Sequence, residues 1–154
     1  MNRFHNIRRA TEDDIFFIQA LEMDPASVFV HSWSQEAHEE NLRNSTYDYL
    51  IAEDLEGTAL GYTILRDDGP QRTEWVRIIV ARRGDGIGSA FMQAVLDDIF
   101  SRKKSKAIWL DVYEQNDRAI HVYEKLGFVK IGEDLTKVPG ERLLIMECCC
   151  PPPA

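Results

Sequence analysis

The sequence lacks any apolar run that approaches the roughly 18–20 residues of a membrane-spanning helix. It also lacks an apolar signal-peptide core in the N-terminal segment MNRFHNIRRATEDD. Its only three cysteines are adjacent, Cys148–Cys150, and neighbouring cysteines do not bridge each other without strain. A disulfide framework is therefore excluded, and we expect a cytoplasmic protein with no membrane partner.

Basic side chains are scarce: 18 Lys and Arg face 26 Asp and Glu, a net charge of −8. This acidity argues against binding to duplex nucleic acid, which needs a basic face. The charge is unevenly divided. Up to Trp75 there are 15 acidic and 6 basic residues, and from Val76 onward 11 and 12. The first half suits a cationic ligand, and the near-neutral second half tolerates an anionic one.

The chain length of 154 residues, with 44% hydrophobic and 29% charged residues, is typical of one folded domain. We expect that domain over residues 1–148, followed by a flexible C-terminal tail, 149–154. Because no His lies near the three cysteines and the remaining His residues have no ligand-like spacing, no metal site is expected.

Hydrophobic periodicity and turn residues predict seven strands and four helices. The strands are expected at 6–9, 47–53, 59–65, 72–80, 107–112, 128–135 and 142–148. The helices are expected from a capping box at 11–14 to before Pro25, and at 35–43, 86–100 and 117–126. Tight turns join the early strands, so these pair antiparallel, whereas the strand–helix–strand unit over 72–112 requires a parallel crossover. The fold class is α/β (α+β), with helices on both faces of a mixed sheet.

A glycine-rich loop, RRGDGIGS at 82–89, connects a predicted strand to a predicted helix. Outward backbone N–H groups at such a position form a phosphate site, although a tight turn without ligand is the simpler alternative. The loop has no P-loop lysine, and Ser89 stands where the dinucleotide fingerprint needs its third glycine. Hairpin-connected strands also precede the loop, which is wrong for a dinucleotide-binding fold.

Two segments carry a family resemblance. The first is Arg83-x-x-Gly86-x-Gly88, and the second is Asn116-x-x-Ala119-x-x-x-Tyr123-Glu124-Lys125-Leu126-Gly127-Phe128. Together with the order of elements, they resemble the GNAT superfamily of acetyl-CoA-dependent N-acetyltransferases. The resemblance implies a mostly antiparallel sheet of six to seven strands, with two central parallel strands that splay apart.

The resemblance implies that acetyl-CoA, the co-substrate, lies in the V-shaped gap between strands 72–80 and 107–112. The implied cofactor-binding residues are Ile78, Val80, Arg82, Arg83, Gly84, Gly86, Gly88, Ser89 and Asn116. The Val80 N–H would polarise the thioester carbonyl. Asn116 has a plain alternative as a helix cap.

Two residues are candidates for catalysis. Tyr123 matches the motif tyrosine that faces the departing sulfur, with a core aromatic as its alternative. Glu74 precedes Val80 by six residues, so regular alternation places both on one strand face. A Glu near this strand position is the general base in some members, and a surface carboxylate is the alternative.

The acceptor is expected to be a primary amine of a small molecule: a polyamine, amino sugar, aminoglycoside or amino acid. Phe29, His31 and Trp33 are candidates for an aromatic wall around it. A protein N-terminus or lysine is the second acceptor class, and a non-catalytic acetyl-CoA sensor is the second functional class. Many relatives dimerise, so a homodimer is a candidate assembly.

Overall fold

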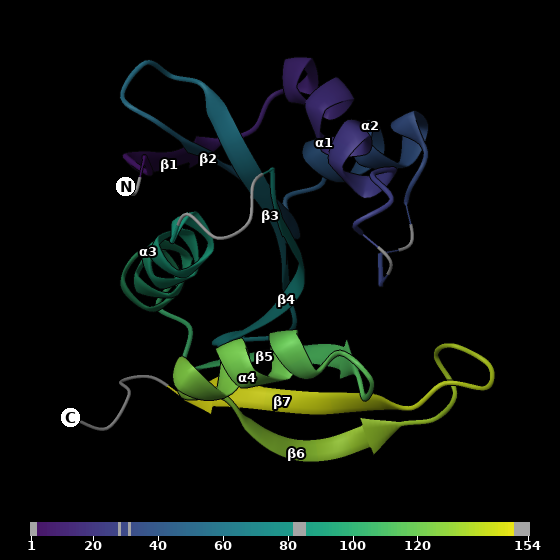
Figure 1. Ribbon diagram of the computed structural model, residues 1–154. Coiled ribbons are helices and arrows are strands. Elements are labelled where there is room, and N and C mark those ends of the chain that lie inside the picture. Colours follow the sequence, from purple (N-terminus) through teal and green to yellow (C-terminus); the bar gives the residue numbers. More distant parts are fainter. Residues whose placement is uncertain (1–2, 28, 31, 82–85, 150–154) are drawn as a thin grey trace.

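One mixed sheet organises the part of the chain that the computed structural model describes, residues 3–27, 29–30, 32–81 and 86–149. Its strands follow the order β1-β2-β3-β4-β5-β7-β6 (Figure 1). They are β1 Asn6–Arg9, β2 Tyr47–Glu53, β3 Ala59–Asp67, β4 Arg72–Val80, β5 Ala107–Tyr113, β6 Val129–Asp134 and β7 Leu143–Cys149. Only β4 and β5 pair parallel, and every other neighbouring pair is antiparallel. The predicted mixed sheet is confirmed.

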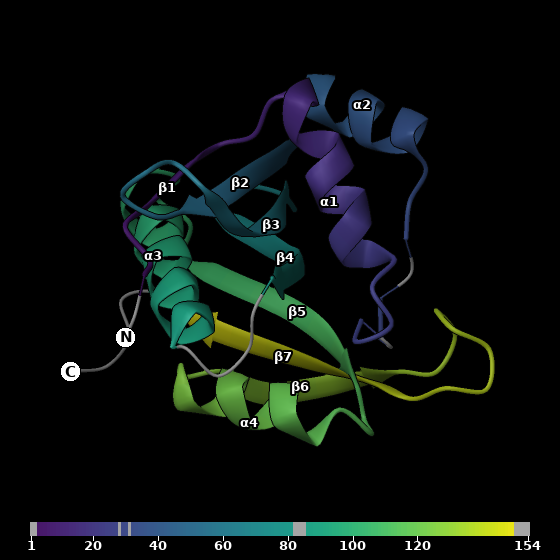
Figure 2. The same cartoon turned by 45° about the horizontal axis from the view of Figure 1, so that its top comes forward.

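Four helices cover the sheet within these residues. Helices α1 (Ile15–Glu22) and α2 (Gln35–Arg43) lie on one face, and α3 (Ile87–Ser101) and α4 (Asp117–Lys125) lie on the other (Figure 2). A short 3-10 turn, Glu12–Asp14, precedes α1. None of the described helices is long and apolar enough to cross a membrane.

The two faces of the sheet bury two separate apolar clusters. The α3 cluster joins the inner side of α3, including Phe91 and Val95, to Ile108 and Leu110 of β5. The α1 cluster joins Ile18 and Leu21 of α1 to Tyr49, Ile51, Tyr62 and Ile64 of β2 and β3. Because strand side chains alternate between faces, cluster membership shows which way each central residue points.

A β-bulge interrupts this alternation in β4. Ile64 of β3 lies opposite Arg77, and Leu65 lies opposite Trp75, so Val76 between them has no opposite residue. An extra residue of this kind bends the strand and shifts its side-chain pattern by one position.

The bulge corrects one prediction about Glu74. Trp75, Ile78 and Val80 all pack in the α3 cluster, which regular alternation would not allow. Glu74 precedes Trp75, and the bulge follows Trp75, so regular alternation still holds between these two residues. Glu74 therefore points to the face of the sheet that α1 and α2 cover. The prediction that Glu74 shares a face with Ile78 and Val80 is therefore wrong, because the extra residue reverses the pattern between them.

The parallel pairing of β4 and β5 is short. It joins Arg72–Glu74 to Ala107–Trp109 and goes no further among the described residues. Beyond it, residues 75–80 of β4 and 110–113 of β5 diverge, as Figure 2 shows. The predicted splay of the two central strands is confirmed, and we call the space between them the β4–β5 gap.

We predict that Gly61→Ala destabilises the fold at the open end of this gap. A Cβ at Gly61 would lie 2.6 Å from the Ile79 carbonyl oxygen and 3.0 Å from the Val80 Cα. The backbone of β4 must shift to admit it, so we expect a loss of about 1–3 kcal/mol in the free energy of unfolding.

The matched control is Gly132→Ala in β6, where the nearest heavy atom is the Ile145 Cδ1 at 4.0 Å. Urea denaturation should show little change, or a slight gain, for this control. Equal unfolding midpoints for the two variants would contradict the close-approach argument.

Candidate active site

The N-terminus of α3 lies just beyond the open end of β4. Gly86 caps the helix in a left-handed conformation, with φ of 74°. The first-turn N–H groups, at Ile87, Gly88 and Ser89, have no partner within the helix. Among the described residues, apart from the chain neighbours and the backbone of α3 itself, no heavy atom lies within 4 Å of a Cβ built at Gly88, so these residues leave the backbone open to a ligand. This helix end suits a phosphate group.

Four predicted site residues lie outside the described residues: Arg82, Arg83, Gly84 and His31. The described remainder of the predicted phosphate loop is Gly86, Gly88 and Ser89, at the cap and first turn of α3. Ile78 and Val80 lie in the diverging part of β4 and are partly buried against the α3 cluster.

Tyr123 projects from α4 into the α3 cluster. Its ring centroid lies 6.4 Å from that of Trp75 and 5.8 Å from that of Phe128. Burial, followed by the negative charge of Asp111, raises the pKa of Tyr123 to about 12. The phenol is therefore protonated near neutral pH and can donate a hydrogen bond, which a phenolate cannot.

Asn116 is the N-cap of α4. Its side-chain oxygen accepts a hydrogen bond of 3.3 Å from the backbone N–H of Ala119. The structure thus shows the capping role that was the alternative for this residue. A contact with a ligand would have to use the side-chain amide NH₂ group.

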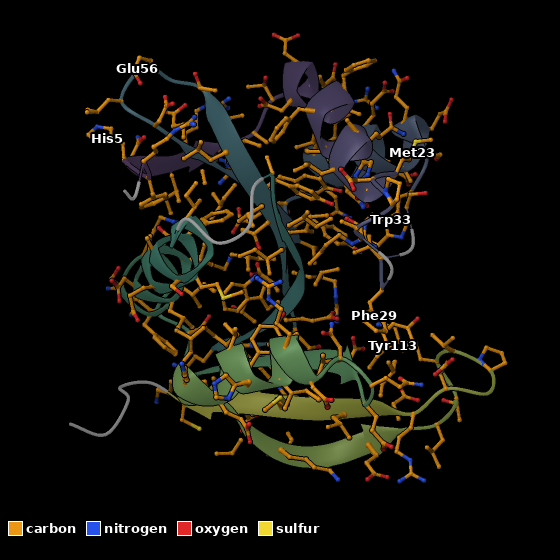
Figure 3. All side chains as sticks on the ribbon, in the orientation of Figure 1. His5, Met23, Phe29, Trp33, Glu56 and Tyr113 are labelled. Carbon is orange, nitrogen blue, oxygen red and sulfur yellow. The ribbon has the colours of Figure 1, made fainter. Side chains whose placement is uncertain are left out.

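Aromatic side chains flank the gap on the α1 and α2 face. The ring centroid of Phe29 lies 5.3 Å from that of Tyr113, at the open end of β5 (Figure 3). Trp33 instead lies over β4, with its ring 4.6 Å from the guanidinium carbon of Arg77. The segment between α1 and α2 thus contacts both diverging strands.

A buried carboxylate joins this segment to β3 and β4. Glu22, at the end of α1, accepts hydrogen bonds from the Trp33 backbone N–H (3.2 Å) and His38 Nε2 (3.0 Å). It also accepts from the Tyr62 hydroxyl (2.7 Å) and the Arg77 guanidinium (2.6 Å). The Glu22 side chain is 0% exposed and that of Arg77 11%. One carboxylate therefore fixes four surrounding elements.

This network was missed at the level of sequence, although two signals for it exist. Arg77 interrupts the apolar strand segment WVRIIV, and a charge among buried positions requires a partner. Glu22 stands in the last turn of α1, where the helix dipole disfavours a negative charge. Neither signal identifies the partner, which lies 55 residues away in the chain.

Glu74 is the last residue of β4 that pairs with β5, at the closed end of the gap. Its carboxylate is 2.7 Å from the Arg66 guanidinium of β3, and the residue is buried. The candidate general base is thus held in an ion pair on the α1 and α2 face.

The cysteines of β7 lie at the closed end of the gap as well. Cys148 pairs with Ile108 and Cys149 with Ala107, whereas Tyr113 marks the open end. Cys148 is buried and Cys149 is exposed, and β7 extends to Cys149. In the described ranges, no group of three or more His, Cys, Asp or Glu side chains could hold a metal ion.

Comparison with known protein families shows to which family the chain belongs. The profile of the acetyltransferase (GNAT) family matches residues 15–128. The chain belongs to the GNAT acetyltransferase family. The match spans α1 to the end of α4, and so includes the splayed strands and Tyr123.

Curated relatives match over shorter segments. Streptothricin acetyltransferase of Streptomyces lavendulae is 34% identical over 84 residues, 51% of this chain and 43% of that protein. Spermine/spermidine N(1)-acetyltransferase of Bacillus subtilis is 31% identical over 65 residues, 42% of this chain and 41% of that protein. The chain thus spans less than half the length of these relatives.

Solved structures share the fold over almost the whole chain. The dodecameric structure of spermidine N-acetyltransferase from Vibrio cholerae gives a TM-score of 0.79 at 22% identity, covering 96% of this chain and 94% of that one. The structure of spermidine/spermine N-acetyltransferase from Vibrio cholerae in complex with manganese ions gives a TM-score of 0.77 at 22% identity, covering 94% of this chain and 91% of that one. At this identity the likeness establishes the fold alone.

We predict that Glu22→Gln strongly destabilises the protein. All four partners of Glu22 donate hydrogen bonds to it, two to each carboxylate oxygen, so the amide NH₂ of Gln must face two donors. Removing one partner of a buried ion pair costs about 3–5 kcal/mol, which urea denaturation at pH 7 would measure.

The effect should depend on pH. Burial pushes the pKa of Glu22 up, but hydrogen bonds from His38 and Tyr62 and the charge of Arg77 outweigh it, leaving the pKa below 4.5. The stabilisation is therefore present above pH 4.5, and the difference from wild type shrinks as the pH falls through the folded-state pKa.

Glu12→Gln, which removes an exposed pair with Arg43, is the control and should change stability by under about 1 kcal/mol. Equal losses in both variants would contradict the role of Glu22.

Proposed function

We propose that this protein transfers the acetyl group of acetyl-CoA directly to a primary amine of a small molecule. The observation that carries the proposal is the β4–β5 gap, which has the α3 N-terminus at its open end and Tyr123 beside it. Membership of the GNAT family and the acetyltransferase names of the curated relatives support it. We assign the activity to a single domain, residues 1–148.

In this proposal, the α3 N-terminus binds the pyrophosphate of acetyl-CoA through the backbone of Gly86, Gly88 and Ser89. Arg82, Arg83 and Gly84 extend that site. Because the pairing with β5 ends at Glu74, Ile78 and Val80 offer backbone groups to the pantetheine arm on the side of β4 that faces β5. The Val80 N–H would polarise the thioester carbonyl, and the Asn116 amide would hold the same arm.

The acceptor amine must be neutral to attack. An alkylammonium has a pKa of about 10.4, so its deprotonation at pH 7 costs roughly 4–5 kcal/mol. The amine nitrogen then bonds to the thioester carbon, the C–S bond breaks and the thiolate leaves. The nitrogen loses one proton and the thiolate takes one up from solvent, which gives the amide and free CoA. A phenol with a pKa of about 12 is too weak an acid to protonate that thiolate readily, so Tyr123 stabilises it by donating a hydrogen bond.

Glu74 is the proposed base, and it faces the side from which the amine arrives. Because Arg66 holds its carboxylate, Glu74 must exchange that partner or act through water to accept a proton. We predict that Glu74→Gln lowers kcat/KM at pH 7 by about 10²–10⁴-fold, the usual contribution of a general base, which initial-rate assays would measure. An unchanged kcat/KM would contradict the assignment.

The acceptor class follows from charge and from the relatives. The first half of the chain, net −9 from its counted residues, contains α1 and α2. The names of the curated relatives include streptothricin and spermine/spermidine acetyltransferases. We therefore propose a polyamine, amino sugar, aminoglycoside or amino acid, with Phe29, His31 and Trp33 beside it. A protein amine is the second acceptor class, and the homodimer stays a prediction.

A thiol-release assay with a panel of amines tests this function, with a thermal-shift screen against CoA, acetyl-CoA and nucleotides beside it. Stabilisation by acetyl-CoA and turnover of at least one small amine would support the proposal. Stabilisation without turnover of any amine would favour an acetyl-CoA sensor. Turnover of peptide amines alone would favour a protein acetyltransferase.

We predict that Tyr123→Phe lowers kcat about 10–100-fold, because a hydrogen bond to a charged group contributes about 1.5–3 kcal/mol. The dissociation constant of acetyl-CoA, measured by calorimetry, should change less than about twofold, since the ring remains. Tyr47→Phe in β2 is the matched control and should leave kcat unchanged. Near-wild-type turnover of Tyr123→Phe would rule out the proposed role.

A further inference from the structure

Three carboxylates lie on the α1 and α2 face beside the β4–β5 gap, and they differ in what they can bind. Glu22 is fully buried and accepts four hydrogen bonds. Glu74 is buried and paired with Arg66. The Asp111 side chain is 20% exposed, and its partner, Lys137, is 50% exposed. Asp111 is thus the one of these three whose partner can be exchanged without opening the core.

The divergence of β4 and β5 leaves Asp111 at the edge of the gap. It lies two residues beyond Trp109, the last residue of β5 that pairs with β4. Its neighbours Leu110 and Val112 pack in the α3 cluster, so Asp111 points to the opposite face. Tyr113, the next residue on that face, contacts Phe29 of the segment between α1 and α2. Asp111 therefore borders the gap on the proposed acceptor side.

The cation now on Asp111 comes from the loop between β6 and β7. The Lys137 Nζ lies 2.6 Å from the Asp111 Oδ2. The base of this loop is ordered by Asp134, whose carboxylate accepts hydrogen bonds from the Thr136 N–H, the Thr136 hydroxyl and the Lys137 N–H. A primary ammonium is therefore held at the edge of the gap, in an exposed pair that contributes little stability.

We propose that Asp111 is a binding site for an ammonium group of the acceptor, and that Lys137 occupies it until the acceptor arrives. The inference rests on the proposed function. A carboxylate favours the charged form of a bound amine, so the group held by Asp111 stays protonated and is not the nucleophile. The acceptor thus carries at least two amino groups: one reacts at the thioester, and a second displaces Lys137.

The test compares putrescine, a four-carbon diamine, with n-butylamine, a monoamine of the same length. Asp111→Asn should raise the KM for putrescine about 10-fold or more and leave that for butylamine unchanged. Lys137→Ala should lower the KM for putrescine by up to about fivefold, because a competing ammonium is removed. Calorimetric titration of putrescine into the complex with CoA, which has no acetyl group to transfer, should show the same changes in affinity.

The matched controls are Lys130→Ala and Glu133→Gln on β6. Their ion pair has a similar length, 2.7 Å, and similar side-chain exposure, 51% and 33%, to the pair under test. Both controls should match wild type for both amines. Thermal melting of every variant separates loss of fold from loss of binding, and Lys137→Ala tests the proposal even where Asp111→Asn is unstable.

Two results for Asp111→Asn would overturn the proposal. One is an equal rise in KM for both amines. The other is a fall in kcat for both amines at unchanged KM, which would identify Asp111 as a base. Unchanged putrescine affinity in Lys137→Ala would also overturn it. Failure of the wild type to acetylate any amine would instead contradict the proposed function. Turnover that is identical in all variants would contradict only the present inference.

Discussion

The early end of the parallel pairing between β4 and β5 is the constraint on which the site depends. After three residue pairs the strands diverge, and among the described residues the pairing between them goes no further. Unpaired backbone groups inside a sheet are costly unless a ligand or solvent satisfies them. The bulge at Val76 and the close approach of β3 at Gly61 keep β4 on its diverging path.

The buried network of Glu22 supports this opening from one side. Two strands that separate lose ladder hydrogen bonds, and the interactions of α1, α2 and their connecting segment replace part of that loss. Glu22 connects Arg77 on β4 to the Trp33 backbone and to His38 of α2. The segment that borders the proposed acceptor side is thus attached to the strand that borders the proposed cofactor side.

Charge is divided between the two faces of the sheet at the gap. The α3 N-terminus presents N–H groups, which suit the phosphates of CoA. The opposite face carries carboxylates that are already neutralised in different ways: Glu22 by buried donors, Glu74 by Arg66, and Asp111 by Lys137. In the proposed function, the burial of each ion pair, more than its charge, determines which carboxylate an incoming ammonium can reach.

The sequence by itself determined the order of elements, the antiparallel and parallel pairings, and the family. These depend on local periodicity, on turn residues and on two motifs that are contiguous in the chain. It failed at Glu74, because a bulge is created by pairing with β3 and leaves no mark in the periodicity of β4. Only the tertiary structure decided which charges meet. Glu22 with Arg77, and Asp111 with Lys137, are contacts between distant segments, and their energies depend on burial that no local pattern encodes.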